Sequence, residues 1–356
     1  MYYYSISYSN PCLNFLKEDF RAIMEKHNSK WFNVQSVPQC YTFPLEERPG
    51  EAPIPICKKI PIIDLGKFLV SSSEKMETIK QILQAGQEFG FFQVINHGIP
   101  ENVVTQTMST FKEFFNMADE QKTNVPSKKG WIYTGSKDEV KNGVHLWRDN
   151  IKHPCHPPEK CMQSWPDKPA SYREVVGTYV EEIKKLSLTI LELICQGLGI
   201  ESGYFEEQSQ VQLLSANNYP PCPDPSLTLG ILKHLDPSLI TIIYQGNVSG
   251  LQVLVDGQWM CIGALPNAFV VNIGNQLEII SNGKLKSVEH RAVTNSREAR
   301  TSIAIFVNPA PNCIVEPAKV LLNESNPPLY KSILYRDFIN ASKAFGIHTD
   351  AIQNEA

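Results

Sequence analysis

Residues 250–262 read GLQVLVDGQWMCI, and this stretch decides the fold class. Two short apolar runs flank Asp256-Gly257, a dipeptide that is typical of the tight turn in a β-hairpin. Further strand-like runs, separated by Gly, Pro and Asn, lie on both sides of it: VQLLSANNY, LITIIYQ, NAFVVNIG, a segment near Val288, and TSIAIFVNP. Many short strands joined by turns predict a sandwich or barrel of the jelly-roll type.

The chain before residue 211 has a more helical pattern. IPIIDL at residues 60–65 and FFQVINHG at residues 91–98 read as short strands. Apolar periodicity predicts helices over about residues 73–89, after Pro100 and over about 171–197, and another helix fits within residues 15–27. In the first of these, the apolar stripe is formed by Met76, Ile79, Leu83 and Gly86. We therefore expect a mixed α/β fold, in which a helical N-terminal region packs against a β-dominated core.

The 356 residues suit one catalytic unit, because no flexible linker separates the two halves. Residues 1–56 read as an N-terminal extension and residues 57–170 as an N-terminal region. The long helix and the β-core follow over residues 171–320. We expect a helical tail over residues 321–356.

The composition argues against several classes of protein. Apolar residues make up 42% and charged residues 20%, which is an ordinary balance for a soluble globular protein. The net charge of −4 gives no reason to expect nucleic acid or anionic lipid as a partner, and no stretch has the roughly 18 apolar residues of a membrane span. Nine scattered cysteines without a CxxC pair favour reduced thiols over a disulfide framework. We expect a cytoplasmic monomer that binds a small molecule.

The chemistry centres on KHLDP at residues 233–237. On a strand, positions i and i+2 face the same side, so His234 and Asp236 can converge on one metal ion. His290, 54 positions after Asp236, can supply a third ligand. Two His and one carboxylate with open positions are the ligands of non-haem Fe(II) oxygenases. The HxD pattern alone is weak, since HTD recurs at residues 348–350, but no histidine follows that copy.

Four further residues fit a dicarboxylic co-substrate. Arg300 and Ser302 share one face of a predicted strand, and an arginine binds a carboxylate through two parallel hydrogen bonds. Asn217 and Tyr219 share a strand face by the same alternation and can contact the other end of the co-substrate. Each of these residues also has an ordinary structural interpretation, as a salt bridge or a packed side chain.

These motifs together resemble the plant 2-oxoglutarate- and Fe(II)-dependent dioxygenase family over nearly the whole chain. The resemblance rests on EFGFFQVINHGIP, NNYPPCPDP, HLDPSLITIIYQ, AFVVNIGNQLEIISNG, SVEHRAV and RTSIAIF, in this order. It implies a double-stranded β-helix core, with Fe(II) at His234, Asp236 and His290. It further implies that 2-oxoglutarate is held by Arg300, Ser302, Tyr219 and Asn217.

Within this family, the stretch from HPCHPPEKC to NNYPPCPDPSLTLG is similar to the hyoscyamine 6-dioxygenase subgroup. The resemblance implies O2 as the oxidant, ascorbate as the reductant, and a small specialised metabolite, alkaloid-like or phenolic, as the substrate. Hydroxylation is the expected outcome, with epoxidation and demethylation as related outcomes. Leu235, Asn275 and Asn218 depart from the usual residues of the family, and they bear on the identity of the substrate.

Three other functions remain compatible with the residues. The first is an Fe(II) oxidase of the aminocyclopropane oxidase type, which does not use 2-oxoglutarate. The second is a catalytically silent β-sandwich that binds a small molecule. The third is a zinc hydrolase, in which the pair Arg300 and Ser302 would have no purpose.

Overall fold

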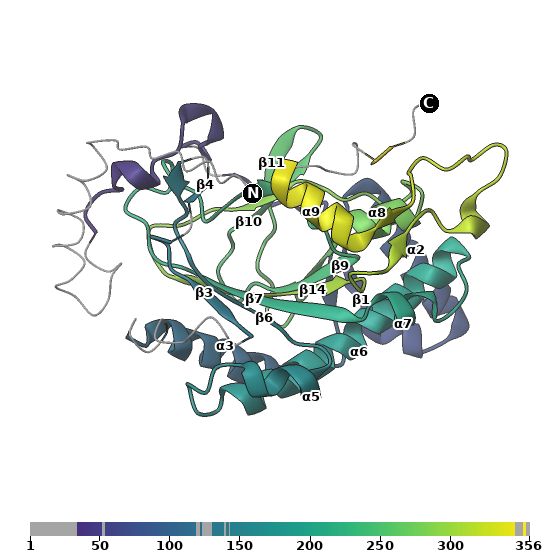
Figure 1. The fold of residues 1–356 in the computed structure, drawn as a ribbon, viewed down its shortest axis with the longest axis horizontal. Helices are drawn as coiled ribbons and strands as arrows, with labels where there is room; N and C mark the ends of the chain where they lie inside the picture. The colour runs from purple at the N-terminus through teal and green to yellow at the C-terminus, as the bar shows by residue number, and fades with distance from the viewer. Residues whose placement is uncertain are drawn as a thin grey trace, which may run out of the picture.

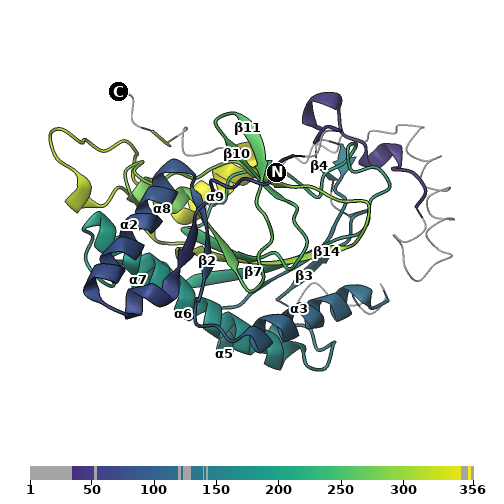
Figure 2. The same ribbon diagram turned by 180° about the vertical axis from the view of Figure 1, so that it is seen from behind.

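The molecule is built around an eight-stranded sheet (Figures 1 and 2). The computed structural model describes residues 34–51, 54–118, 122, 130–138, 140–141, 143–345 and 352–353. In spatial order the strands are β1 (Ile62–Asp64), β2 (Phe91–Ile95), β12 (Phe269–Ile273), β9 (Ile240–Tyr244), β14 (Arg300–Asn308), β7 (Val211–Tyr219), β6 (Asp149–Pro154) and β3 (Ile132–Thr134). All neighbours pair antiparallel except β1 and β2, which are parallel.

A second, four-stranded sheet forms the other layer of the β-core. Its order is β11 (Gln258–Cys261), β10 (Leu251–Val255), β13 (His290–Ala292) and β8 (Ile231–His234). The predicted hairpin joins β10 to β11, and Asp256 and Gly257 in its turn have φ angles of 49° and 75°. Apolar side chains from the two sheets meet between them, among them Phe91, Ile243 and Val253. This arrangement is the predicted jelly roll.

Helices cover the outer face of the large sheet (Figures 1 and 2). The three long ones are α2 (Ser72–Glu88), α3 (Glu101–Asn116) and α6 (Tyr172–Leu198), close to their predicted bounds. Strand residues alternate between the two faces, so that Phe92, Val271 and Ile305 pack in the core beneath these helices. Long α6 ends at Gly199, whose φ of 73° is a left-handed conformation that glycine adopts without strain.

The predicted stripe of α2 is wrong at Met76, which is 63% exposed. The buried face contains Ile79, Ile82 and Gly86. The C-terminal end of α6 lies against this face, because Gly197 sits beside Ile79 and Leu83.

Other elements differ from the sequence prediction in extent. Residues 60–65 form only the short strand β1, followed by the 3-10 helix η3 (Leu65–Leu69). Between residues 321 and 345 only α9 (Tyr335–Phe345) is helical, and the predicted helix at residues 15–27 lies outside the described residues. The remaining elements are η1 (Gln39–Tyr41), η2 (Leu45–Glu47), β4 (Val140–Lys141), β5 (Val144–His145), α5 (Pro158–Cys161), η4 (Met162–Ser164), α7 (Tyr204–Gln208), α8 (Asn275–Ile280), β15 (Ile314–Val315), η5 (Lys319–Leu321) and β16 (Ile333–Leu334).

Strands from both halves of the chain form the large sheet. The strands β1, β2, β3 and β6 precede residue 170, and they extend the sheet at both edges of the later strands. The domain boundaries at residues 56, 170 and 320 stay a prediction. Among the described residues, none of the helices combines the length and the apolar character that a membrane crossing requires.

Candidate metal and co-substrate site

The structure brings His234, Asp236 and His290 together at one end of the small sheet. His234 is the last residue of β8, and it pairs in register with His290, the first residue of β13. The sequence pattern predicted that Asp236 shares a strand with His234. Asp236 instead lies in the loop after β8. One ligand atom from each residue lies within 4.8 Å of the other two. The Nε2 atom of His234 lies 3.6 Å from Oδ1 of Asp236, and the Nε2 atom of His290 lies 3.6 Å from Oδ2.

Both histidines are oriented by the backbone behind them. Nδ1 of His234 lies 2.8 Å from the carbonyl of Leu232, and Nδ1 of His290 lies 3.1 Å from the carbonyl of Val288. A carbonyl only accepts, so each ring donates Nδ1–H to it, and the lone pair of Nε2 faces the site. The Phe91 ring packs against His290 with centroids 5.3 Å apart and holds it from the side.

The two oxygens of Asp236 have different surroundings. Oδ2 accepts hydrogen bonds from Thr241 Oγ1 at 2.6 Å and from Asn272 Nδ2 at 2.9 Å. Oδ1 is buried and has no hydrogen-bond partner among the described residues. A buried carboxylate oxygen without a partner is costly, because it has lost its water and gained nothing in exchange. A divalent cation between Oδ1 and the two Nε2 atoms would remove this cost, so the residues fit a metal ion.

The protonation states of the three residues also suit a metal. Burial alone favours the neutral form of Asp236, but His290 and His234 and the two hydrogen-bond donors outweigh it and lower the pKa of Asp236. Burial and the neighbouring His290 lower the pKa of His234. At neutral pH the site therefore offers a carboxylate and an unprotonated imidazole, the forms that bind metals.

The four predicted co-substrate residues lie on the inner face of the large sheet. Arg300 pairs in register with Tyr219, and Ser302 pairs with Asn217, across strands β14 and β7. All four side chains are buried. The guanidinium of Arg300 lies over the Tyr219 ring, 5.0 Å from its centroid, and its Nε donates to the carbonyl of Val248 at 3.1 Å. Burial lowers the pKa of Arg300, but a guanidinium keeps its proton at neutral pH.

Two glycines make the space that Arg300 and Tyr219 occupy. A Cβ on Gly250 would lie 2.8 Å from Cδ of Arg300, and a Cβ on Gly230 would lie 2.3 Å from Cδ1 of Tyr219. Neither distance is compatible with a side chain at these positions. The site is therefore shaped by backbone as well as by functional groups.

Several residues of the site were not predicted from the sequence. Thr241 and Asn272, which hold Asp236, are paired in register on β9 and β12. Arg148, just before β6, and Asn150, within it, both donate to Oδ1 of Asn217 at 2.9 Å. Polar residues within apolar runs, such as the Asn of AFVVNIG, were the available signal. Their partners could only be found once the register of the sheet was known.

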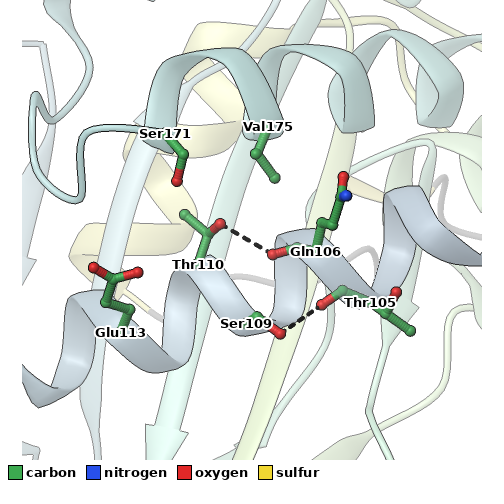
Figure 3. A pocket seen from close by; sticks show the side chains of 7 residues that line it. All are labelled: Thr105, Gln106, Ser109, Thr110, Glu113, Ser171 and Val175. Carbon is green, nitrogen blue, oxygen red and sulfur yellow. Dashed lines mark hydrogen bonds between the residues drawn. The ribbon is translucent and has the colours of Figure 1, made fainter.

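A surface groove lies elsewhere, between α3 and the start of α6 (Figure 3). It encloses about 410 Å³ and contains Thr110, Ser109 and Glu113. Thr110 and Ser109 donate to backbone carbonyls of their own helix. The groove lies in the helical layer that covers the outer face of the large sheet, and its lining residues offer one carboxylate and no cluster of reactive groups. We therefore take His234, Asp236 and His290 as the candidate functional site.

Comparison with known proteins places this geometry in a family. Residues 210–309 match the model of the 2OG-Fe(II) oxygenase superfamily, and residues 60–168 match the N-terminal region of the non-haem dioxygenases in morphine synthesis. Hyoscyamine 6-dioxygenase from Hyoscyamus niger is 41% identical over 326 residues, which are 87% of this chain and 92% of that protein. Flavanone 3-dioxygenase 2 from Oryza sativa subsp. japonica is 37% identical, over 85% of this chain and 89% of that protein.

A solved structure agrees with these relatives. The crystal structure of JOX2 in complex with 2OG, Fe and JA is 32% identical in sequence, with a TM-score of 0.79. The match covers 94% of this chain and 97% of that one. The family predicted from the ordered motifs is confirmed. This chain belongs to the 2OG-Fe(II) oxygenase superfamily and is a dioxygenase that uses Fe(II) and 2-oxoglutarate.

Proposed function

We propose that His234, Asp236 and His290 hold Fe(II), and that Arg300, Ser302, Tyr219 and Asn217 hold 2-oxoglutarate. The observation that carries this proposal is the buried Oδ1 of Asp236, which has no hydrogen-bond partner among the described residues. Asp236 belongs to one cluster with His234 and His290, and its Oδ1 lies 3.6 Å from Nε2 of His234. Two imidazoles and a single carboxylate leave the remaining coordination positions open for co-substrate and O2.

Each group of residues has its own part in the reaction. When bound, the iron and 2-oxoglutarate supply the oxidising power, through a decarboxylation that yields succinate and CO2. Arg300 neutralises one carboxylate of the co-substrate and holds it by paired hydrogen bonds, with the hydroxyl of Ser302 beside it. The apolar cluster between the sheets limits the access of water to this region. The protein thus supplies position and shielding, and the bound groups supply the chemistry.

We propose a small specialised metabolite, alkaloid-like or phenolic, as the substrate, and hydroxylation as the reaction. The names of the relatives support this class, because they include a hyoscyamine 6-dioxygenase and a flavanone 3-dioxygenase. Leu235 sits between two metal ligands and is partly buried, so its apolar side chain can contact the substrate. Ascorbate is the proposed reductant that keeps the iron in its Fe(II) form.

A direct test measures co-substrate and product together. Purified protein with Fe(II), 2-oxoglutarate and ascorbate is incubated with a panel of plant alkaloids and phenolics, and O2 consumption, succinate and product mass are followed. We expect one succinate for each O2 and a product heavier by one oxygen atom, and neither with the Asp236→Ala variant. Oxygen consumption without succinate would instead support an oxidase that does not use 2-oxoglutarate.

We also propose that the protein is a monomer in the cytoplasm. Eight cysteines are among the described residues, and all of them are free thiols, which suits a reducing compartment. Light scattering during size-exclusion chromatography and localisation of a tagged chain test these two points separately.

A further inference from the structure

Asn217 is held by two donors, one on the neighbouring strand β6 and one directly before it. Nη1 of Arg148 and Nδ2 of Asn150 each lie 2.9 Å from its Oδ1. Asn150 is the direct cross-strand partner of Asn217 in the pairing of β6 with β7. All three side chains are buried, with exposed fractions of 6%, 2% and 5% for Arg148, Asn150 and Asn217. The contact is therefore part of the interior and not a surface encounter.

These two hydrogen bonds fix which way the amide of Asn217 points. An amide carries an acceptor on one side and a donor on the other, and its two flipped states differ only in their partners. If the group were flipped, the NH2 would face two donors, one of them a cation, and both hydrogen bonds would be lost. Since Oδ1 is taken, the donor Nδ2 points elsewhere, and it makes no hydrogen bond with the described residues.

The strand order indicates where Nδ2 points. Asn217 lies on the central strand of three, with Asn150 of β6 on one side and Ser302 of β14 on the other. Its Oδ1 is held toward β6, so the other arm of the planar amide is left on the side of β14. Ser302 and Arg300, the residues proposed to hold 2-oxoglutarate, lie on that strand.

We propose that Arg148 and Asn150 are positioning residues, which lock the amide of Asn217 so that its Nδ2 donates a hydrogen bond to a carboxylate oxygen of 2-oxoglutarate. This inference rests on the proposed function of the same site. The device has a physical purpose, because a donor that is oriented before the co-substrate binds loses no freedom on binding. In this arrangement the guanidinium of Arg148, in addition to that of Arg300, lies near a co-substrate that carries two negative charges.

The sharpest test compares Asn217→Asp with Asn217→Ala in the Fe(II) protein. With Asp, one oxygen keeps the contacts with Arg148 and Asn150 and forms an ion pair, so the thermal stability should be unchanged or higher. The second oxygen replaces Nδ2 and repels the co-substrate. In anaerobic titrations we expect the Kd for 2-oxoglutarate to rise about tenfold with Ala and further with Asp. If Asp binds 2-oxoglutarate as well as Ala or better, the proposed orientation is wrong.

A double-mutant cycle tests whether Arg148 acts through Asn217. Arg148→Met should weaken 2-oxoglutarate binding severalfold in the wild-type background and should add little when Asn217 is already Ala. Equal effects in both backgrounds, or a rise in KM for the organic substrate alone, would mean that Arg148 contacts a ligand itself, and would overturn the proposal. Arg173→Met is the matched control, because Arg173 donates to the carbonyl of Trp165 beside α6 and should leave binding unchanged.

The same titrations separate this proposal from the proposed function. Arg300→Gln should weaken 2-oxoglutarate binding in any case. If it does so while Asn217→Asp has no effect, only the orienting role fails. If neither variant changes 2-oxoglutarate binding, the co-substrate site itself is misplaced. The comparison of the two Asn217 variants remains decisive even where Arg148→Met does not fold.

Discussion

Thr241 donates a 2.6 Å hydrogen bond to Oδ2 of Asp236 from a fully buried hydroxyl group. Asn272, on the next strand of the large sheet, donates to the same oxygen. The carboxylate is thus held from behind by the large sheet, while Nε2 of His234 lies 3.6 Å from its other oxygen, Oδ1, and Nε2 of His290 lies 3.6 Å from Oδ2. The proposed metal site therefore depends on contact between the two layers of the jelly roll.

We predict that Thr241→Val lowers the affinity for Fe(II) by about tenfold, in line with the usual effect of removing a residue that supports a metal ligand. Valine has nearly the same shape as threonine, so packing is preserved, and what is lost is the hydrogen bond to Asp236 together with the 3.0 Å contact with the Ser238 hydroxyl. Anaerobic competition with a chelator measures the affinity. Thr241→Ser keeps the hydroxyl and should bind iron like the wild type, whereas equal loss in both variants would point to packing.

Replacing Arg300 should mainly affect the co-substrate. Arg300→Ala removes a buried cation, and we expect KM for 2-oxoglutarate to rise on the order of 100-fold, as for the loss of one partner of a buried charge pair. Arg300→Lys should recover only part of this loss, because an ammonium cannot form two parallel hydrogen bonds with a carboxylate. Steady-state succinate release measures KM, and an unchanged value would remove Arg300 from this role.

Gly250→Ala should weaken 2-oxoglutarate binding although Gly250 is no proposed ligand. The added Cβ would lie 2.8 Å from Cδ and 3.0 Å from Nε of Arg300, so the guanidinium must move. We expect a severalfold rise in the Kd for 2-oxoglutarate with little change in Fe(II) affinity, measured by anaerobic titration. Gly263→Ala is the control, since its Cβ meets only the side chain of Ile56, at 3.1 Å. A similar loss in the control would indicate a general disturbance of the sheet.

His153 should make the folded state sensitive to acid. It lies 2.8 Å from the hydroxyl of Tyr172, and burial lowers its pKa from 6.5 to about 4. The unfolded chain therefore takes up this proton first as the pH falls, and stability is lost between about pH 6.5 and pH 4. The full contribution of a shift of this size is about 3 kcal/mol.

Denaturant unfolding of the metal-free protein at several pH values tests this expectation. His153→Gln keeps a donor and an acceptor but cannot be protonated, so its free energy of unfolding should fall less between pH 6.5 and pH 4 than that of the wild type. Parallel curves for the two proteins would show that His153 contributes nothing to the pH dependence.

Much of the fold could be predicted because it is encoded locally. Three features each depend on a few neighbouring residues: the Asp256-Gly257 turn, the helical apolar period that α6 keeps along its length, and the apolar alternation in residues 301–309. The departures arise from packing partners, as at Met76, which is 63% exposed although it fits the apolar period of α2. An apolar stripe in the sequence does not say which of its residues a neighbouring element covers.

The residue types of the candidate site were predicted from the sequence, and the structure brings the three expected ligands together, but their geometry was less predictable. His234, Asp236 and His290 were found from chemistry and spacing, but Asp236 lies in a loop because β8 ends at His234. Arg148 and Thr241 were not found, since their roles come from cross-strand register. Sequence distance carries no information about register: Arg148 and Asn217 are 69 residues apart and in hydrogen-bond contact.

The strand order has a consequence for exchanging parts between relatives. A chimera that joins one enzyme before residue 170 to another after it has a single crossover in the sequence but two seams in the sheet, β2 against β12 and β6 against β7. The second seam includes Asn150 and Asn217, so a mismatch there would disturb the co-substrate site as well as the sheet. Transplanting a substrate preference within this family therefore calls for strand β6 to travel with its partner β7.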